Sequence, residues 1–352
     1  MGRSTVVTGW GMSLPDQVRT NQDLESIVDT TDEWIRSRTG IRERRIASED
    51  ESTYTLALEA SKQALETAKL SPEDVEMIIV ATLTPDFGFP AVSNLLQDAL
   101  DASDAAAVDI NSACTGFLSG LALADGLIVS GHLDNVLLVG AETMSRVVDW
   151  SDRATCVLFG DAAGAAVLQK SDSGGGILKS VLGSDGSGAM SLYLRGGGSR
   201  YQANAHTIAN GDHFLKMDGR EVYRFAVKAM VDCTIDTARR AGVPLDEFDL
   251  FIPHQANIRI INSAIRELDV PESKFFVNVD RYGNTSAASI PVALCEAIDE
   301  GRIEPGSKVM MVAFGAGLAW AGTALEWTAP VPDRGVVGAG LSARERLGVL
   351  PS

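Results

Sequence analysis

The sequence predicts an α/β protein made of two similar halves. Apolar, β-rich runs alternate with amphipathic helical patterns along most of the 352 residues, which is typical of strands and helices packed in layers. The second half repeats the first in order and spacing, since Val80 precedes Cys114 by 34 positions and Ile252 precedes Asn284 by 32. Such self-similarity indicates a duplicated unit packed about a pseudo-twofold axis. Two unrelated halves that share only a generic alternation are the alternative.

The first half contains the elements with the strongest patterns. Strands are expected at 5–9, 75–83, 106–110, 135–140 and 162–168, and helices at 52–68, 91–100 and 116–130. Ser52 or Thr53 should cap the first helix, because either side chain can accept a backbone N–H. The helix at 116–130 carries no charge before Asp125, so we expect it to be buried on all sides. A glycine-rich, irregular region is expected over 171–198.

The second half should repeat this order. Strands at 250–253, 276–279, 308–313 and 318–325 correspond to those ending near Thr82, at Ile110, at Gly140 and at Leu168. The loop at 111–116 has its counterpart at 282–287. The predicted division is therefore one half over 1–172, a second over 173–330, and an appended tail over 331–352 that contains Pro, Gly and Arg without periodicity.

Composition and charge exclude several classes of protein. Hydrophobic residues make up 45% and charged residues 22%, which is typical of globular chains and not of disordered ones. A net charge of −17 opposes binding to nucleic acid or to anionic lipid. The uncharged run at 309–325 contains three glycines and reads as buried strands, and no secretory signal is visible. We therefore expect a cytoplasmic protein without nucleic-acid or membrane partners.

The sequence shows no pattern for a metal or a resident cofactor. Its four cysteines are far apart and its four histidines lack ligand spacing. The one G-x-G after a predicted strand, at 9–11, lacks the third glycine of a dinucleotide-binding loop. No G-x-S-x-G is present, which argues against an α/β-hydrolase.

Three polar residues follow predicted strands at the same edge of the duplicated structure. Cys114 opens the uncharged helix, whose positive N-terminal end should favour the thiolate, the nucleophilic form. His254 and Asn284 also follow predicted strands, and open α/β sheets bind ligands at strand carboxyl ends. Taken singly, each could be structural: a small buried thiol, a satisfied histidine or a turn residue. Together they would form a nucleophile with two hydrogen-bond donors.

The segments around these residues are Asn-Ser-Ala-Cys-Thr-Gly-Phe at 111–117, Pro-His-Gln-Ala-Asn at 253–257 and Tyr-Gly-Asn-Thr-Ser-Ala-Ala-Ser at 282–289. They resemble motifs of the β-ketoacyl-acyl-carrier-protein synthase III family, in the thiolase superfamily. The similarity runs from about Val6 to about Trp327 and includes the segments 32–35, 38–41, 159–161 and 314–317. It implies a thiolase-like fold in which two duplicated βαβαβ-type halves form a five-layered α-β-α-β-α core.

The resemblance implies an acyltransferase that initiates fatty acid biosynthesis as a homodimer. Cys114 would take a short acyl group from acyl-CoA, which is a substrate, and no cofactor is implied. Malonyl-acyl carrier protein would then decarboxylate, and its enolate would attack the acyl-cysteine. His254 and Asn284 would stabilise the enolate, and the backbone N–H groups of Cys114 and Ala316 would stabilise the tetrahedral oxyanion.

Further residues are implied by their places in the family's motifs. The CoA-binding residues would be Trp34, Arg38, Arg153 and Asn257, and the acyl pocket would be lined by Phe89 of a partner subunit, Met144 and Phe159. Carrier-protein docking would use Arg224, Arg259 and Arg266. Each set also has a structural alternative. The acyl-pocket residues could belong to an ordinary apolar core, and the docking residues could be unpaired surface arginines. Arg38 could be part of a solvated basic face with Arg36, Arg42, Arg44 and Arg45.

Three other functions compete with this one. A related acyltransferase of specialised metabolism would keep Cys114 and His254 but need not use carrier-bound malonate. A non-catalytic partner subunit would be expected to lose the cysteine, which this chain retains. The third alternative is a chalcone-synthase-like enzyme, whose C-terminal glycine motif fits this sequence less well. The default primer is an acetyl group or a slightly longer straight chain.

Overall fold

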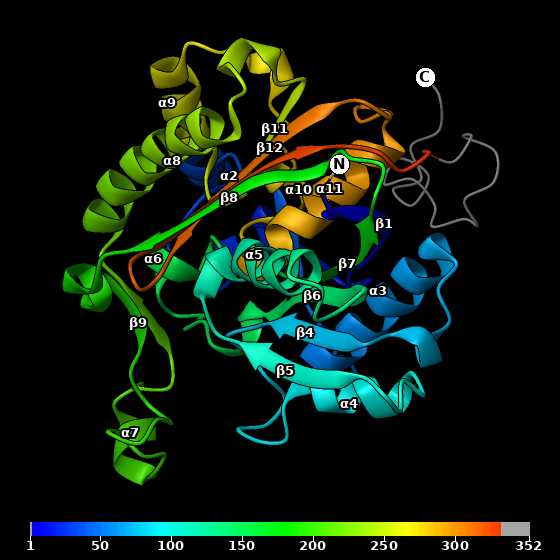
Figure 1. The fold of residues 1–352 in the computed structure, drawn as a ribbon. Coiled ribbons are helices and arrows are strands. Elements are labelled where there is room, and N and C mark those ends of the chain that lie inside the picture. The colour runs from blue at the N-terminus through cyan, green and yellow to red at the C-terminus, as the bar shows by residue number, and fades with distance from the viewer. Residues whose placement is uncertain (1, 332–352) are drawn as a thin grey trace, which may run out of the picture.

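The computed structural model describes residues 2–331, and two sheets form its framework (Figure 1). The first sheet has the order β1 (Ser4–Ser13), β7 (Asp161–Ser171), β6 (Asn135–Thr143), β4 (Met77–Ala81) and β5 (Ala106–Ile110). The second has the order β8 (Gly176–Ser184), β13 (Ala319–Glu326), β12 (Lys308–Gly315) and β11 (Leu250–Pro253). In both sheets the first two pairings are antiparallel and the third is parallel. The predicted duplicated α/β fold is confirmed.

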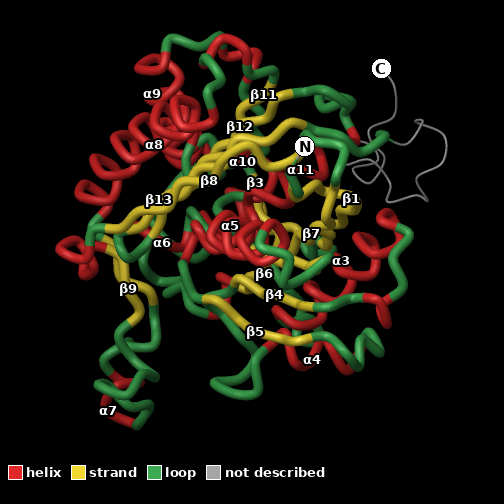
Figure 2. The backbone as a smooth tube through the Cα atoms, in the orientation of Figure 1, coloured by secondary structure: helices red, strands yellow, loops and turns green. Residues whose placement is uncertain are grey.

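Helices cover both sheets and fill the space between them (Figures 1 and 2). The outer layer on the first sheet is α3 (Thr53–Ala68) with α4 (Val92–Ala99). The middle layer is α5 (Gly116–Val129) with α11 (Ser289–Asp299), which contact strands of both sheets. The outer layer on the second sheet is α8 (Gly219–Ala241), against which α9 (Ile258–Leu268) packs. This arrangement gives the expected five α-β-α-β-α layers.

The remaining elements are short and lie mainly around the ends of the sheets. They are β2 (Val18–Thr20), α1 (Asn21–Glu25), α2 (Asp32–Thr39), β3 (Glu43–Arg45), α6 (Arg153–Cys156), β9 (Leu192–Leu194), α7 (Ala205–Ala209), β10 (Leu215–Met217) and α10 (Val279–Tyr282). The 3₁₀ turns are η1 (Pro72–Asp74), η2 (Ala113–Thr115), η3 (Met144–Arg146), η4 (Gly186–Ser191), η5 (Leu245–Glu247), η6 (Glu272–Lys274) and η7 (Ser286–Ala288). The segment from β9 through α7 extends away from the layered body (Figure 1).

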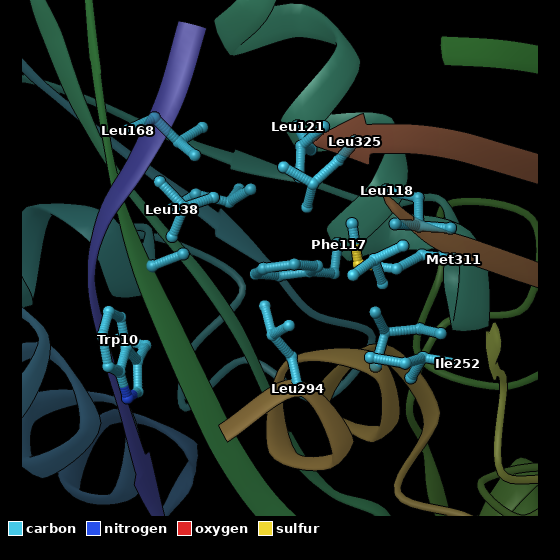
Figure 3. Close-up of a cluster of buried hydrophobic side chains, with 14 of the residues drawn as sticks. Trp10, Phe117, Leu118, Leu121, Leu138, Leu168, Ile252, Leu294, Met311 and Leu325 are labelled. Carbon is cyan, nitrogen blue, oxygen red and sulfur yellow. The ribbon is translucent and has the colours of Figure 1, made fainter. Parts of the chain in front are cut away.

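The central core lies between the two sheets and holds α5 in place. Phe117, Leu118 and Leu121 of this helix are fully buried among side chains from both sheets, including Leu138 and Met311 (Figure 3). Full burial of such a side chain stabilises the fold by roughly 1.5–3 kcal/mol. The helix that begins next to Cys114 is therefore fixed from both sides.

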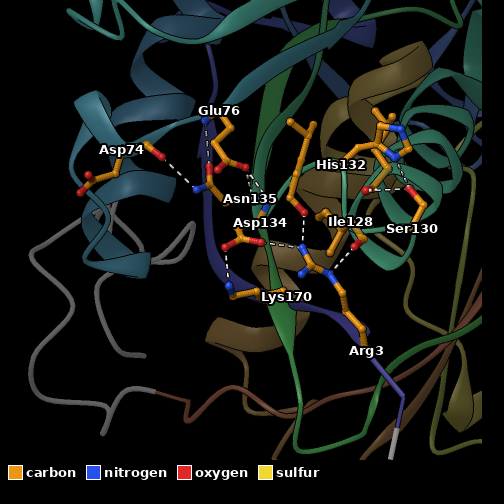
Figure 4. A network of polar contacts seen from close by, with 11 residues as sticks. Arg3, Asp74, Glu76, Ile128, Ser130, His132, Asp134, Asn135 and Lys170 are labelled. Atoms are coloured by element: carbon orange, nitrogen blue, oxygen red, sulfur yellow. Dashed lines mark hydrogen bonds and ion pairs between the residues drawn. The ribbon is translucent and has the colours of Figure 1, made fainter.

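Polar contacts fix the other end of α5 (Figure 4). The guanidinium of Arg3 donates to the carbonyl oxygens of Ile128 and Leu133 and pairs with Asp134 at 2.6 Å. Asp134 also pairs with Lys170 of β7. A cation near the carbonyl end of a helix is favourable because it complements the helix dipole. These contacts join α5 to the start of β1 and to β7.

Three expectations about individual elements are wrong. The helix α5 is not buried on all sides, because Leu123 and Val129 lie on its surface face and are 50% and 46% exposed. The region 171–198 is not irregular throughout, since it contains β8, an edge strand entered through a turn of glycines with positive φ. No regular strand forms at 276–279, where the backbone contributes only an isolated bridge between Phe251 and Phe275 before α10.

Some expectations are not decided by these elements. The division into halves at 172 and 173 stays a prediction. Residues 332–352, which make up all but the first residue of the expected tail, lie outside the described part. Within residues 2–331, no helix is long and apolar enough to cross a membrane.

Candidate active site

One cavity of about 100 Å³ brings Cys114, His254 and Asn284 together. They come from η2, from the end of β11 and from the loop before η7, and they are 6%, 1% and 8% exposed. The rest of the lining is mainly apolar: Leu158, Phe159, Leu192, Met217, Gly219, Val222, Tyr223, Phe225, Ala256, Asn257, Ile260, Phe314, Gly315 and Leu318. The arrangement places a thiol, an imidazole and an amide in surroundings that exclude most water.

Cys114 lies where the turn after β12 approaches the start of α5. A Cβ atom built on Gly315 would lie 2.9 Å from the backbone nitrogen of Cys114, so only glycine allows this approach. Ala316 is the next residue in the chain. The pKa of the Cys114 thiol is raised to about 12, chiefly by burial; the Ser286 hydroxyl lowers this pKa and the negative charge of Glu142 raises it. The expectation that the site favours the thiolate is therefore wrong, because desolvation outweighs the helix dipole.

His254 is oriented by one contact and faces the cavity with its other nitrogen. Its Nδ1 lies 2.6 Å from the Ser289 hydroxyl oxygen at the start of α11. Its Nε2 is buried, and no residue between 2 and 331 is its hydrogen-bond partner. Burial lowers the pKa of His254 to about 3, so the imidazole is neutral near pH 7. A neutral ring of this kind can donate or accept a hydrogen bond but is a poor base.

Asn284 is held by the backbone on both sides. Its N–H donates to the carbonyl of Leu158 at 2.8 Å, and its carbonyl accepts from Gly160 at 3.1 Å. Its side-chain oxygen accepts the N–H of Ser286 at 2.8 Å. The amide NH₂ group is therefore the part of the side chain left to donate to a ligand.

The residues expected to bind CoA gather partly outside the cavity. The guanidinium carbons of Arg38 and Arg153 lie 4.5 Å and 4.7 Å from the centre of the Trp34 ring. Asn257 lines the cavity, and its side chain caps α9 by accepting the N–H of Arg259. An aromatic ring close to two cations suits a ligand that is both planar and anionic.

The alternative of a solvated basic face is wrong for two of its arginines. Arg44 is fully buried and donates to the carbonyl oxygens of Arg19 and Val157 and to the side chain of Asn21. Arg45 is 8% exposed and donates to the carbonyl oxygen of Pro15. Both arginines thus bind backbone inside the fold.

The three residues expected in the acyl pocket lie in different surroundings. Phe159 lines the cavity and pairs with Asn284 through an isolated bridge. Met144 packs in a neighbouring buried cluster with Ile35 and Cys156 and is not part of the cavity lining. Phe89 is 90% exposed in the loop before α4. A single chain therefore brings only Phe159 to the site.

The arginines expected at the carrier surface lie on two adjacent helices. Arg224 is exposed on α8 and pairs with Glu221 at 3.0 Å. Arg259 and Arg266 are exposed on α9, and Arg266 donates to Ser263. The two helices are joined by a hydrogen bond between Tyr223 and Ser263.

Sequence reasoning missed three residues behind the site: Glu142, Ser286 and Ser289. The two serines lie inside the motif at 282–289, but their roles depend on which way each side chain points. Glu142 gave a signal, because it is a carboxylate at the end of the apolar run 135–141. A buried carboxylate of this kind needs partners, and those come from segments distant in sequence.

Within residues 2–331, no group of three His, Cys, Asp or Glu could hold a metal.

Comparisons with known proteins agree on one family. The family described as 3-oxoacyl-[acyl-carrier-protein (ACP)] synthase III matches residues 108–186, and its C-terminal family matches 238–327. A β-ketoacyl-[acyl-carrier-protein] synthase III of Symbiobacterium thermophilum is 51% identical over 92% of this chain and 98% of its own length.

Solved structures give the same result. The 3-oxoacyl-[acyl-carrier-protein] synthase III of Aquifex aeolicus VF5 is 46% identical, covers 92% of this chain and 100% of its own, and has a TM-score of 0.85. The priming β-ketosynthase of the R1128 polyketide biosynthetic pathway is 36% identical, covers 94% and 98%, and has a TM-score of 0.87.

Proposed function

Because the chain belongs to the 3-oxoacyl-[acyl-carrier-protein] synthase III family, we propose that Cys114 is its acyl-accepting nucleophile and that His254 and Asn284 stabilise its enolate. The chain is an acyltransferase that condenses a short acyl-CoA primer with malonyl-acyl carrier protein and so initiates fatty acid biosynthesis. The observation that supports the residue roles is the single cavity that these three side chains share, although they are up to 170 positions apart.

In the first half-reaction, the sulfur of Cys114 attacks the thioester carbonyl and CoA leaves as its thiolate. The carbonyl oxygen becomes an oxyanion in the tetrahedral intermediate, and backbone N–H groups of Cys114 and Ala316 donate to it. The close approach of Gly315 to Cys114 supports this role, because the Ala316 N–H belongs to the peptide that follows Gly315.

In the second half-reaction, malonyl-acyl carrier protein loses CO₂ and its thioester becomes an enolate. His254 donates from Nε2 and Asn284 from its NH₂ group to the enolate oxygen. In this role the ring proton resides on Nε2, and Nδ1 accepts from the Ser289 hydroxyl 2.6 Å away. Preorganised donors act strongly in an enclosed, apolar cavity, because little water competes for the developing charge. The enolate carbon then attacks the acyl-cysteine.

The CoA nucleotide is proposed to bind outside the cavity, and its pantetheine arm to enter it. Trp34 stacks on the adenine, Arg38 and Arg153 pair with the nucleotide and its phosphates, and Asn257 contacts the arm. The carrier protein is proposed to dock on Arg224, Arg259 and Arg266. The net charge of −17 would repel an acidic carrier protein, so a cationic patch of this kind is needed for docking.

The active form is proposed to be a homodimer in which Phe89 enters the partner's acyl pocket. Four features support it: the exposed Phe87 and Phe89, the free edge strand β5 with Val108 37% exposed, and the exposed face of α5 at Leu123. An uncovered strand edge and neighbouring apolar side chains favour association. Light scattering of wild type and of Phe89→Ala, each with its acyl-loading rate, tests the assembly and the pocket role separately.

Incubation with a panel of acyl-CoAs, then with malonyl-acyl carrier protein, tests the proposed function. Intact-protein mass should show one acyl group on the enzyme, which the second substrate removes as a β-ketoacyl product. The similarity to a polyketide priming enzyme makes primer choice the point that separates the two pathways. A preference for acetyl-CoA or a slightly longer straight-chain primer supports the fatty acid role, and a preference for other primers supports specialised metabolism.

A further inference from the structure

Glu142 is a fully buried carboxyl group directly behind the candidate active site. It lies at the end of β6, and its oxygens accept from the Leu83 N–H at 3.1 Å, the Thr84 hydroxyl at 2.6 Å and the Ser286 hydroxyl at 3.0 Å. The Thr82 hydroxyl is 3.3 Å away. None of these partners carries a positive charge. Burying a carboxylate without a cation is costly, so its presence here needs an explanation.

Ser286 connects this carboxyl group to the nucleophile. It belongs to η7, which packs against η2, the turn that contains Cys114, and against β6. Its hydroxyl donates to Oε1 of Glu142 at 3.0 Å, and the effect of this hydroxyl on Cys114 is to lower the pKa of the thiol. A hydroxyl can donate one hydrogen bond while it accepts another. Ser286, which packs beside the Cys114 turn, can therefore accept a proton from the thiol while its own hydroxyl donates to Glu142.

The acyl-transfer step requires a base that the three cavity residues do not supply. The thiol of Cys114 must lose its proton before or during attack on the thioester. Burial lowers the pKa of His254 to about 3, so its imidazole has little affinity for that proton. The Asn284 amide is not a base, and the N-terminal end of α5 can stabilise a negative charge but cannot accept a proton.

We propose that Glu142 is the proton acceptor for Cys114 and that it acts through the hydroxyl of Ser286. The inference rests on the proposed function, since it assumes that Cys114 is acylated. As sulfur attacks the thioester carbon, the thiol proton moves to Oγ of Ser286 and the serine proton moves to Oε1 of Glu142. The S–C bond forms, the C–S bond to CoA breaks, and the CoA thiolate leaves and takes a proton from solvent.

The second half-reaction returns the proton. When the enolate carbon attacks the acyl-cysteine, Cys114 leaves as a thiolate. It takes a proton from Ser286, which takes one from Glu142, and the carboxylate is regenerated. Over one cycle the enzyme gains no net proton, and the one consumed from solvent ends on CoA. Glu142 therefore stores a proton for the interval in which Cys114 is acylated.

The electrostatics of the pair agree with this exchange. Burial raises the pKa of Glu142 to about 7, and its negative charge raises the pKa of Cys114, so one charge on either group disfavours a second. The groups that bind Glu142 from the β4 loop and from η7 are hydroxyls and an N–H, which do not titrate near neutral pH. On the neighbouring strand β7, Asp161 binds Ser145 and the amide of Ala47 instead.

Single-turnover acylation of the full-length enzyme by acetyl-CoA, followed from pH 5.5 to 9 by intact mass, tests the proposal. Wild type should gain rate as Glu142 ionises, with a midpoint near 7. Glu142→Gln and Ser286→Ala should lose that midpoint and slow acylation at pH 7 by about 10²-fold, the range for loss of a general base. Ser61→Ala is the control, because it also removes a fully buried hydroxyl, on α3. It should keep the wild-type profile.

The outcomes separate the two proposals. A wild-type enzyme that gains no acyl group contradicts the proposed function itself. An acylated wild type whose midpoint persists in both variants overturns the role of Glu142 alone. If Glu142→Gln does not fold, Ser286→Ala decides the matter. That variant keeps the other contacts of Glu142, and the backbone N–H of residue 286 still holds Asn284.

Discussion

The Nδ1 atom of His254 lies 2.6 Å from the hydroxyl oxygen of Ser289, whereas its Nε2 atom faces the cavity. This contact joins the end of β11 to the start of α11 and fixes the ring plane. The side chain that should donate to the enolate is thus oriented from the middle helical layer. A change at Ser289 should therefore alter the chemistry without touching the substrate.

Ser289→Ala should slow condensation with malonyl-acyl carrier protein by roughly 3- to 10-fold, the effect expected for losing one hydrogen bond of about 1 kcal/mol. The imidazole would be less well oriented, and its proton would no longer be held on Nε2. Acyl loading from acyl-CoA, measured separately by rapid quench, should stay near the wild-type rate. Equal slowing of both half-reactions would show that Ser289 acts on the fold.

His254→Ala and Asn284→Ala should spare acyl loading more than malonyl decarboxylation. Both side chains address the enolate, whereas loading relies on backbone donors. Losing one donor of this type costs about 10²- to 10³-fold in rate. Single-turnover loading and release of labelled CO₂ measure the two steps. Loading that falls as far as decarboxylation in both variants would contradict the assigned roles.

His254 should also make the fold less stable in acid. Its pKa is lowered to about 3 in the folded chain from 6.5, so the unfolded chain binds a proton that the folded chain rejects. The stabilising contribution is complete above pH 6.5 and is lost as the pH falls towards 3. In urea unfolding, the free energy of unfolding should fall by about 2–3 kcal/mol because of this residue between pH 6.5 and about 4.5. His254→Ala should lack this fall. If the free energy of unfolding depends on pH in the same way in wild type and in His254→Ala, His254 is protonated in the folded chain.

Arg259→Glu should raise the KM for malonyl-acyl carrier protein and make it less dependent on salt. The exposed arginine is proposed to contact an acidic partner, and such charges are screened beyond roughly 8 Å at physiological salt. Loading from acyl-CoA should barely change. Arg240→Glu is a matched control, since Arg240 is exposed at the opposite end of α8, about 24 Å from Arg224. An unmoved KM in Arg259→Glu places the docking surface elsewhere.

The sequence was sufficient for the fold because each half carries its own strand and helix patterns. The strand at 106–110 was predicted correctly, and the helix cap is Ser52, one of the two residues predicted, since both features depend on local chemistry. The strand β8 was not predicted, because its pairing with β13 depends on residues about 140 positions away. The exposed face of α5 was also missed, since composition shows that a helix is apolar and not what covers it.

The site was predictable in its membership but not in its electrostatics. Cys114, His254 and Asn284 each follow a predicted strand, the internal duplication indicated a common edge, and the three residues line one cavity. The raised pKa of Cys114 could not be foreseen, because it depends on enclosure by Gly315 and on the charge of Glu142. Gly315 and Glu142 come near Cys114 only after distant strands have packed.

The most direct test of the account is the location of the acyl group after incubation with acetyl-CoA. Wild type should gain one acetyl mass, peptide mapping should place it on Cys114, and malonyl-acyl carrier protein should remove it. Cys114→Ala should fold normally and gain nothing, because the change removes one sulfur from a loop of small residues. Changes at Cys156, Cys233 or Cys295, which are buried away from the cavity, should leave loading unaltered. An acetyl group that persists in Cys114→Ala, or that maps to another residue in wild type, would contradict the account.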